Sequence, residues 1–421
     1  MAFTPVFRNY SRSSAVKYDR LASAAICGEI KTVPYFDHNA TAPLAPAARE
    51  AWLRAHDEAW QNPSGLYSGG ARVRVRLDTA REQFAQLLGG AAARVVFNSG
   101  ATEGANAVCA HLARTLPPGV LVAVNRTEHP CVLEAAKFFL GERIVWLEVD
   151  CHGVVSAGQV EKLLASGSPS TGSGQGIGAV VVMAANNETG VLQPWRELAR
   201  LCRRHHTAFF CDASQWLGKL PAAGLGEADW VIGSAHKFGG PKGVGFVLAG
   251  EGAENFHAQQ GGGQEHGHRA GTENFPGVAA MVAALVEAET RKVLLETERL
   301  RWREMFERAL PAALPGVRVV GAGADRLWNT VSLILPHGEN TRWVTRLDKR
   351  GFQVSTGSAC ATAKEGPSHV LAAMGCSTEE ARRVIRASAG WETAETDWPK
   401  LAQALAEVSA EVRPADVVVK I

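Results

Sequence analysis

Residues 208–215 read AFFCDASQ, and residues 230–237 read WVIGSAHK. Each stretch is a short apolar run that ends in polar residues. The same theme repeats between about residue 90 and residue 250, with helix-like stretches between most of the runs. Such alternation of strands and helices predicts an α/β domain with a mostly parallel sheet. The seven expected strands are Arg94–Asn98, Val120–Asn125, Ile144–Val149, Ala179–Ala184, Ala208–Cys211, Trp230–Ile232 and Gly245–Leu248.

The pattern changes after Pro276. A long helical stretch runs towards Leu310, and the strands that follow are sparser, with helices between and after them. This pattern predicts a second, smaller α+β domain. We expect a large domain over residues 45–288 and a small domain made of residues 1–44 and 289–421. The expected strands of the small domain are Val317–Val320, Thr330–Leu335 and Val384–Ala387.

The composition excludes several classes of protein. With 421 residues, 46% of them apolar, the chain can bury a sizeable core. Its formal net charge of +2 gives no reason to expect nucleic-acid binding, and no apolar run is long enough for a membrane span. Eight scattered cysteines without a CxxC pair are typical of a reducing compartment, so we expect a cytoplasmic protein.

Polar residues follow five of the expected strands, where open α/β sheets bind their ligands. They bring an imidazole, an amide, a carboxylate, hydroxyls and an amine towards one edge of the sheet. Each residue alone has an ordinary structural explanation, because Asp212 can cap a helix and His129 can be a hydrogen-bonded core histidine. Their joint placement indicates a site. The stretches are SGATE (99–103), TEHP (127–130), NNETG (186–190), DASQ (212–215) and SAHK (234–237).

This set of groups suits pyridoxal-phosphate chemistry. The cofactor needs a lysine for its Schiff base and a carboxylate to keep its pyridine nitrogen protonated. Lys237, with Ser234 and His236 beside it and a Gly-rich turn after it, is the favoured lysine, and Lys242 is the alternative. The Gly-rich run lacks the spacing of a P-loop, which argues against an NTPase.

A phosphate site is expected at the stretch SGATE. Gly100 permits a tight turn, and a helix begins near Ala101 and Thr102. The free N–H groups of a helix N-terminus can hold a phosphate.

Longer motifs around these residues resemble a known family. In their order and spacing they are similar to the cysteine desulfurases of the NifS/IscS type, within the class V aminotransferases. The resemblance runs from about Tyr35 to about Trp391. The motifs are YFDHNATAPL (35–44), SGATE, TEHP, NNETG, DASQ, SAHKFGGPKGVG (234–245), GGGQEHGHRAGTEN (261–274), STGSAC (355–360), PSHVL (367–371) and VIRASAG (384–390).

The resemblance implies a homodimer of PLP fold type I and a role for each matched residue. Lys237 carries the cofactor, Asp212 holds the pyridinium nitrogen, and His129 stacks on the ring. The remaining matches are Gln215 and Asn187 near the ring oxygen, with Asn187 also near the substrate; Ala101, Thr102, Ser234 and His236 at the phosphate; Thr272 at the partner subunit's phosphate; and Arg386 at the substrate carboxylate.

Cys360 matches the family's nucleophile, in a segment of small residues that suits a loop that must move. The implied reaction converts L-cysteine to L-alanine, with Lys237 or His129 as the base, and leaves the sulfur on Cys360 as a persulfide. The implied sulfur acceptor is an iron–sulfur scaffold or a thiolation protein.

Alternatives to this activity are a selenocysteine lyase, another class V enzyme, and a catalytically silent partner protein. Cys360 argues against transamination, which needs no thiol. The sequence departs from the common family pattern at His38, Ala42 and His266. The pair His266 and His268 lacks further ligands at suitable spacing, so we expect no metal site.

Overall fold

The structure is a computed structural model, and it describes residues 33–166, 176–357 and 368–412. The described residues from Tyr35 onward form one compact unit, which contains every element named below. The expected nucleophile, Cys360, lies outside the described residues. Within the described ranges, no helix combines the length and the apolar character that crossing a membrane requires.

The large sheet has seven strands in the order β1-β7-β6-β5-β4-β2-β3. β7 is antiparallel to both of its neighbours, and the other adjacent pairs are parallel. All seven strands expected from the sequence are present, so the predicted α/β fold is confirmed. Their bounds are β1 Val95–Asn98, β2 Leu121–Asn125, β3 Ile144–Leu147, β4 Ile177–Val181, β5 Ala208–Asp212, β6 Trp230–Ser234 and β7 Gly245–Leu248.

Both faces of this sheet are buried. Along β5, Phe209 and Cys211 point into one apolar core, whereas Phe210 points into the other. β6 repeats the arrangement, with Val231 in the first core and Ile232 in the second. Because successive side chains of a strand point to opposite faces, strands that are apolar throughout need helices on both sides of the sheet.

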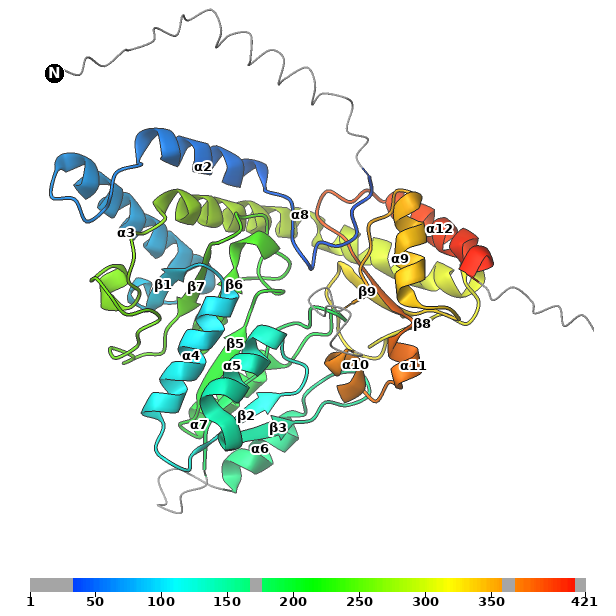
Figure 1. Cartoon of the computed structure of the whole chain (residues 1–421), viewed down its shortest axis with the longest axis horizontal. Coiled ribbons are helices and arrows are strands. Elements are labelled where there is room, and N and C mark those ends of the chain that lie inside the picture. Colours follow the sequence, from blue (N-terminus) through cyan, green and yellow to red (C-terminus); the bar gives the residue numbers. More distant parts are fainter. Residues whose placement is uncertain (1–32, 167–175, 358–367, 413–421) are drawn as a thin grey trace, which may run out of the picture. The chain divides into compact units, whose positions relative to one another are not determined.

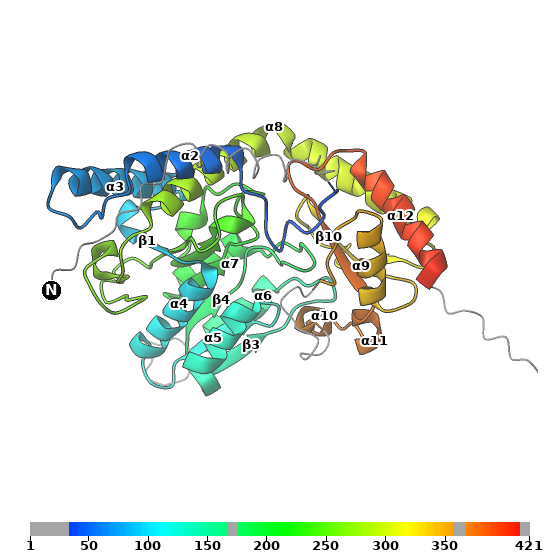
Figure 2. The ribbon, with the colours of Figure 1, turned by 45° about the horizontal axis from the view of Figure 1, so that its top comes forward.

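Helices form these two covering layers. α4 and α5 pack against each other and cover one face, and α2, α3 and α8 pack together over the other, as Figures 1 and 2 show. The helices are α2 Pro46–Glu58, α3 Ser68–Leu88, α4 Ala101–Thr115, α5 Pro130–Leu140, α6 Ala157–Ala165, α7 Trp195–Arg204, α8 Phe275–Ala313, α9 Asn340–Lys349, α10 His369–Ala373, α11 Thr378–Ala381 and α12 Asp397–Val412.

A smaller sheet of three antiparallel strands, in the order β10-β9-β8, accounts for the predicted α+β region. α8 joins the two cores, because Leu285 lies in the core of the large sheet and Phe306 lies in the core of the small one, with Trp343 and Trp398. The domain boundaries at residues 45 and 288 stay a prediction. The strands are β8 Arg318–Val319, β9 Thr330–Ile334 and β10 Val384–Ser388.

A buried ion pair fixes the turn η6 (Glu265–Gly267) against α3. Arg81 donates two hydrogen bonds to the Glu265 carboxylate, at 2.6 and 2.9 Å, and a third to the carbonyl of Val95 at 2.7 Å. Glu265 also accepts the N–H of Phe97 at 2.8 Å. Both charged side chains are almost fully buried, and His266, next to Glu265, has a φ of +56°. The pair therefore holds a strained turn in the segment that precedes Thr272.

We expect Arg81→Met to lower the free energy of unfolding by about 3–5 kcal/mol, because it leaves the buried Glu265 carboxylate without its cation. Urea unfolding of the full chain measures this change. Arg76→Met on the same helix is the matched control. Its partner Glu58 is half exposed, and the variant should stay within about 0.5 kcal/mol of the wild type. Equal losses in the two variants would contradict the assignment.

Candidate active site

Lys237 lies at the carboxyl edge of the large sheet. It ends the short helical turn η5 (Ala235–Lys237), which follows β6 directly. Its Nζ donates hydrogen bonds to the main-chain carbonyls of Asn39 at 2.8 Å and Ala40 at 2.9 Å. The amine therefore points towards the stretch that precedes α2. The alternative lysine, Lys242, is exposed in the turn before β7.

Asp212 is the last residue of β5 and lies beside the end of β6, because the two strands pair in parallel. Its carboxylate is buried and accepts the N–H of Ser214 at 2.8 Å. Among the described residues it has no ion-pair partner. Buried carboxylates in proteins are usually paired with a cationic group as well as hydrogen-bonded. The position is therefore suited to a protonated ring nitrogen.

His129 follows β2 and caps the N-terminus of α5. Its Nδ1 accepts the N–H of Cys131 at 3.1 Å, so in the neutral ring the proton lies on Nε2. Burial lowers the pKa of His129, the Asp212 charge opposes this shift, and the charges of Lys237 and His369 add to it. His129 is therefore a neutral imidazole at neutral pH, within electrostatic reach of both Asp212 and Lys237.

Glu128, which precedes His129 in the chain, carries a fully buried carboxyl group. Glu128 Oε1 accepts the N–H of Met183 at 2.5 Å and the amide of Asn125 at 3.2 Å, while Oε2 has no partner among the described residues. Burial, and then the negative charge of Asp212, raise the pKa of Glu128 to about 8. Glu128 is therefore mostly protonated at pH 7. The sequence alone gave no reason to assign Glu128 a role.

The expected phosphate ligands gather where β6 meets the start of α4. The Ser234 hydroxyl oxygen accepts the N–H of Ala101 at 2.8 Å. The close approach of the start of α4 to Ser234 requires glycine at position 100. There φ is +148°, and a Cβ atom would lie 3.2 Å from the Ser234 hydroxyl. Thr102 is exposed at the first turn of α4. The helix N-terminus and these hydroxyls form a site suited to an anion.

His236 lies in the same region. Its Nδ1 is 3.2 Å from the Thr41 hydroxyl, and burial, with the charges of Lys237, Lys242 and Lys219, lowers its pKa to about 4. His236 is therefore neutral at neutral pH and offers a hydrogen bond rather than a charge.

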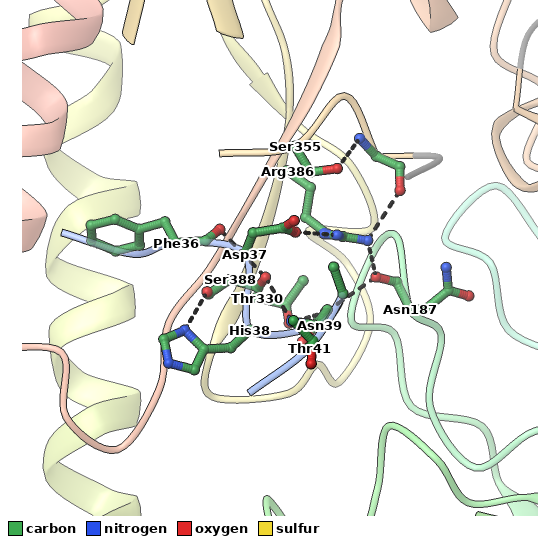
Figure 3. A network of polar contacts seen from close by, with 12 residues as sticks. Phe36, Asp37, His38, Asn39, Thr41, Asn187, Thr330, Ser355, Arg386 and Ser388 are labelled. Atoms are coloured by element: carbon green, nitrogen blue, oxygen red, sulfur yellow. Dashed lines mark hydrogen bonds and ion pairs between the residues drawn. The ribbon is translucent and has the colours of Figure 1, made fainter. Parts of the chain in front are cut away.

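Arg386, in the middle of β10, faces the edge of the large sheet. Figure 3 shows its guanidinium group between the carboxylate of Asp37 and two main-chain carbonyls. The distances are 2.5 Å to Asp37 Oδ1, 2.8 Å to the carbonyl of Asn187 and 3.0 Å to that of Gly357. The guanidinium is almost fully buried, and its Nε has no partner among the described residues. The guanidinium group is thus fixed in position by three acceptors. Its Nε–H is the donor that could bind a ligand.

Asn39 ties these parts together and was not assigned a role from the sequence. Its amide donates to the carbonyl of Asn187 at 3.1 Å and to the Thr330 hydroxyl at 2.9 Å, and its main-chain N–H donates to the Ser388 hydroxyl at 3.0 Å. Its carbonyl accepts from both Lys237 and Gln215, at 2.8 and 2.9 Å. Its only signal in the sequence is its place inside YFDHNATAPL.

Of the remaining predicted residues, Thr272 is not brought into this cluster, and Cys360 lies outside the described residues. Thr272 is exposed in the segment that precedes α8, so its contact with a partner subunit stays a prediction. The role of Cys360 also stays a prediction. The residues on either side of its segment do contact the site, because Gly357 accepts from Arg386 and Ser368 donates to Glu188 at 2.6 Å. The described residues contain no cluster of metal ligands.

Pyridoxal phosphate fits the groups that are present. An amine, an unpaired buried carboxylate, a neutral imidazole and a helix N-terminus meet at the ends of β6, β5, β2 and β1. These are the groups that the cofactor's aldehyde, ring nitrogen, ring face and phosphate need.

The fold is that of the class V aminotransferases, and the chain belongs to that family. The family's sequence pattern, described as Aminotransferase class-V, matches residues 34–400. The resemblance predicted from the motifs is confirmed at this level.

Individual relatives cover most of the chain. The "Cysteine desulfurase IscS" of Dictyoglomus turgidum is 33% identical over 374 residues, which are 87% of this chain and 92% of the relative. The "Cysteine desulfurase" of Klebsiella pneumoniae is 35% identical over 368 residues, which are 86% and 89% of the two chains. The crystal structure of a NifS-like protein from Rickettsia africae matches with a TM-score of 0.79 at 26% identity, and the match covers 90% of this chain and 99% of the other.

The raised pKa of Glu128 predicts a pH-dependent stability. The carboxyl ionises near its ordinary value of 4.5 in the unfolded chain but only near pH 8 in the folded protein, so the folded state holds the extra proton between these values. The contribution of Glu128 to stability must therefore fall as the pH rises from about 4.5 to about 8. Glu128→Gln should be more stable than the wild type by on the order of 4 kcal/mol at pH 8 and by little at pH 5.

Urea unfolding of both proteins at the two pH values measures this difference. Glu148→Gln, which changes an exposed carboxylate, is the control and should follow the wild type at both. The same gap between Glu128→Gln and the wild type at pH 5 and at pH 8 would mean that Glu128 is ionised in the folded protein.

Proposed function

We propose that this protein is a pyridoxal-phosphate-dependent cysteine desulfurase, which converts L-cysteine to L-alanine and passes the sulfur to Cys360. The observation that carries the proposal is the meeting of Lys237, Asp212 and His129 at one edge of the sheet, to which Asn39 and Asn187 link the buried guanidinium of Arg386. The relatives named cysteine desulfurases, which align over nearly the whole chain, support the choice of substrate.

Each part of the cofactor has a residue suited to hold it. Lys237 is the covalent anchor, Asp212 the partner of the ring nitrogen, and His129 the ring that stacks. Ala101, Thr102, Ser234 and His236 would hold the phosphate, and Gln215 and Asn187 would bind the ring oxygen. Pyridoxal phosphate, when bound, withdraws electrons from the α-carbon of an amino acid and so makes its α-proton acidic.

Arg386 binds and orients the substrate carboxylate. A guanidinium can hold a carboxylate with two parallel hydrogen bonds, and here three acceptors already fix its plane. The α-proton then passes to a base of the chain. Lys237 Nζ and the imidazole of His129 are the two groups placed for that role, and the lowered pKa of His129 keeps its ring unprotonated at neutral pH.

Cys360 takes the sulfur. Its thiolate forms an S–S bond with the sulfur of the substrate while the C–S bond of the substrate breaks, and the electron pair of that bond stays with the three-carbon product. Protonation of the product releases alanine, and Cys360 keeps a persulfide. The positive charges of Arg386 and Lys237 favour the thiolate form of a cysteine that approaches them.

Other protein chains complete the proposal. A homodimer is supported by the exposure of Thr272 and by large apolar side chains that lie open on α2, α3 and the loop between them. A sulfur-acceptor protein, either an iron–sulfur scaffold or a thiolation protein, removes the persulfide sulfur. A cytoplasmic location is supported by the six described cysteines, all of which are free thiols. The exposed apolar residues are Trp52, Leu53, Trp60, Leu66, Tyr67 and Val75.

The decisive experiment follows alanine release and sulfur transfer from L-cysteine. The full chain loaded with pyridoxal phosphate should release alanine, and mass spectrometry should find the extra sulfur on the peptide that contains Cys360. Cys360→Ala should keep the cofactor's visible absorption and lose at least about 100-fold in alanine release, because no thiolate takes the sulfur.

Cys151→Ala, which changes an exposed cysteine elsewhere in the sequence, is the control and should keep full turnover. Full-rate desulfuration by Cys360→Ala, or sulfur on another cysteine, would overturn the proposal. Alanine released from selenocysteine but not from cysteine by the wild type would identify a selenocysteine lyase instead.

Arg386→Lys should lower kcat/KM for L-cysteine by about 100-fold, because a single ammonium cannot replace the forked pair of hydrogen bonds. Asp37→Asn keeps an acceptor beside Arg386 but removes its charge, so the loss there should be smaller. Steady-state kinetics with matched cofactor loading measures both. An unchanged kcat/KM in Arg386→Lys would assign the substrate carboxylate to another residue.

A further inference from the structure

Lys219 is a buried lysine beside the proposed site, and no step of the proposed reaction uses it. Only 5% of its surface is exposed. Among the described residues, no carboxylate forms an ion pair with its ammonium group. A lysine that serves only packing or stability is rarely left buried without a counter-charge, because removing the charge from water costs several kcal/mol. A contribution to stability therefore does not explain why a lysine is buried at position 219.

The ammonium group of Lys219 makes its contacts with one residue of the site. Its Nζ donates to the side-chain oxygen Oε1 of Gln215 at 3.0 Å and to the main-chain carbonyl of Gln215 at 3.3 Å. On the other side of the same amide, Gln215 Nε2 donates to the carbonyl of Asn39 at 2.9 Å, and this carbonyl also accepts from Lys237. A chain of hydrogen bonds thus links the two lysines.

These partners leave the Gln215 amide only one orientation. An ammonium group can only donate, so the atom that faces Lys219 must be the oxygen. A main-chain carbonyl can only accept, so the atom that faces Asn39 must be the nitrogen. The nitrogen carries two N–H groups, and the bond to Asn39 uses one of them. The second N–H therefore remains as a donor of fixed direction.

The turn that carries Lys219 is built to lie against the residue after Lys237. Gly218 has a φ of +73°, and a Cβ atom there would lie 2.3 Å from the Cβ of Phe238. Only glycine allows this approach. Burial, and then the charges of Lys237 and Arg386, lower the pKa of Lys219 to about 7. Lys219 thus lies close to the cationic side chains of Lys237 and Arg386, and a ligand with more than one negative charge would favour the ammonium form of Lys219.

We propose that Lys219 is a positioning residue that fixes the Gln215 amide, so that a Gln215 N–H is presented to an anionic ring oxygen of the bound cofactor. The inference rests on the proposed function, because Gln215 has a cofactor ring oxygen beside it only if the protein binds pyridoxal phosphate. Lys219 does not touch the cofactor in this arrangement. It acts through Gln215, and its charge strengthens the donor along the chain of hydrogen bonds.

A double-mutant cycle on Lys219 and Gln215 tests the inference. The readouts are the dissociation constant of pyridoxal phosphate and the pH midpoint of the cofactor's visible band, measured on the full chain. Lys219→Met should weaken cofactor binding about tenfold and shift the midpoint, because one charge-assisted hydrogen bond is lost. In a Gln215→Leu background, the same substitution should change both readouts by less than about threefold in the corresponding constant.

Three further variants separate positioning from other effects. Lys219→Arg keeps a donor-only side chain, and a cavity of about 50 Å³ that Lys219 lines leaves room for it, so its binding should stay within about threefold of the wild type. Lys162→Met removes an exposed lysine of α6 and should change nothing. Lys237→Ala should lack the cofactor's normal visible absorption band and serves as the negative control for that readout.

Thermal unfolding of the cofactor-free chain excludes a merely structural role. Lys219→Met should unfold at the same or a higher temperature than the wild type, because it removes a buried charge. A lower unfolding temperature that accounts for the weaker binding would overturn the inference. A tenfold effect that persists in the Gln215→Leu background, or no effect in the wild-type background, would also overturn it.

The failure of the proposed function looks different from the failure of this inference. If the wild type bound no pyridoxal phosphate, the proposed function and the positioning role of Lys219 would both be wrong. If the wild type bound the cofactor and released alanine while the cycle on Lys219 and Gln215 was additive, only the positioning role would be lost.

Discussion

The main-chain carbonyl of Asn39 is the acceptor on which the geometry of the site depends. It receives hydrogen bonds from Lys237 at the end of β6 and from Gln215 after β5. The side chain of the same residue binds Asn187 after β4 and Thr330 at the start of β9. One almost fully buried residue thus joins both sheets to the proposed cofactor lysine. A change in the path of residues 37–41 would displace all of these groups together.

Electrostatics sets the second condition of the site. Glu128, Asp212, Lys219 and Arg386 are all nearly excluded from water. Arg386 forms an ion pair with Asp37, whereas burial next to Asp212 raises the pKa of Glu128 and keeps it protonated at pH 7. The same burial strengthens every remaining interaction, since the local dielectric is low. A ligand that brings both a protonated nitrogen and negative oxygens matches this distribution of charge.

The sequence alone was sufficient for the fold and for naming the candidate residues at the edge of its sheet. The strands were readable because each is a short apolar run, and the helices were readable from the stretches between them. The residues at the strand ends could be named because parallel strands bring their carboxyl ends to one edge. The sequence carried no comparable signal for Glu128, Asn39 or Lys219. Glu128 and Asn39 lie inside quoted motifs and Lys219 follows one, but nothing in the neighbouring residues along the chain distinguishes any of the three from a residue exposed to solvent.

The sequence by itself determined the order of the elements, the α/β class and the identities of the polar residues at the sheet edge, because these depend on neighbours along the chain. Only the tertiary structure decided which of those residues are buried, which are paired and which change their pKa. Lys237 and Asn39 are 198 positions apart, and Arg386 and Asp37 are 349 apart, yet both pairs are in hydrogen-bond contact. Burial and charge depend on distances in space, and those distances exist only once the two sheets, α8 and the stretch before α2 have packed together.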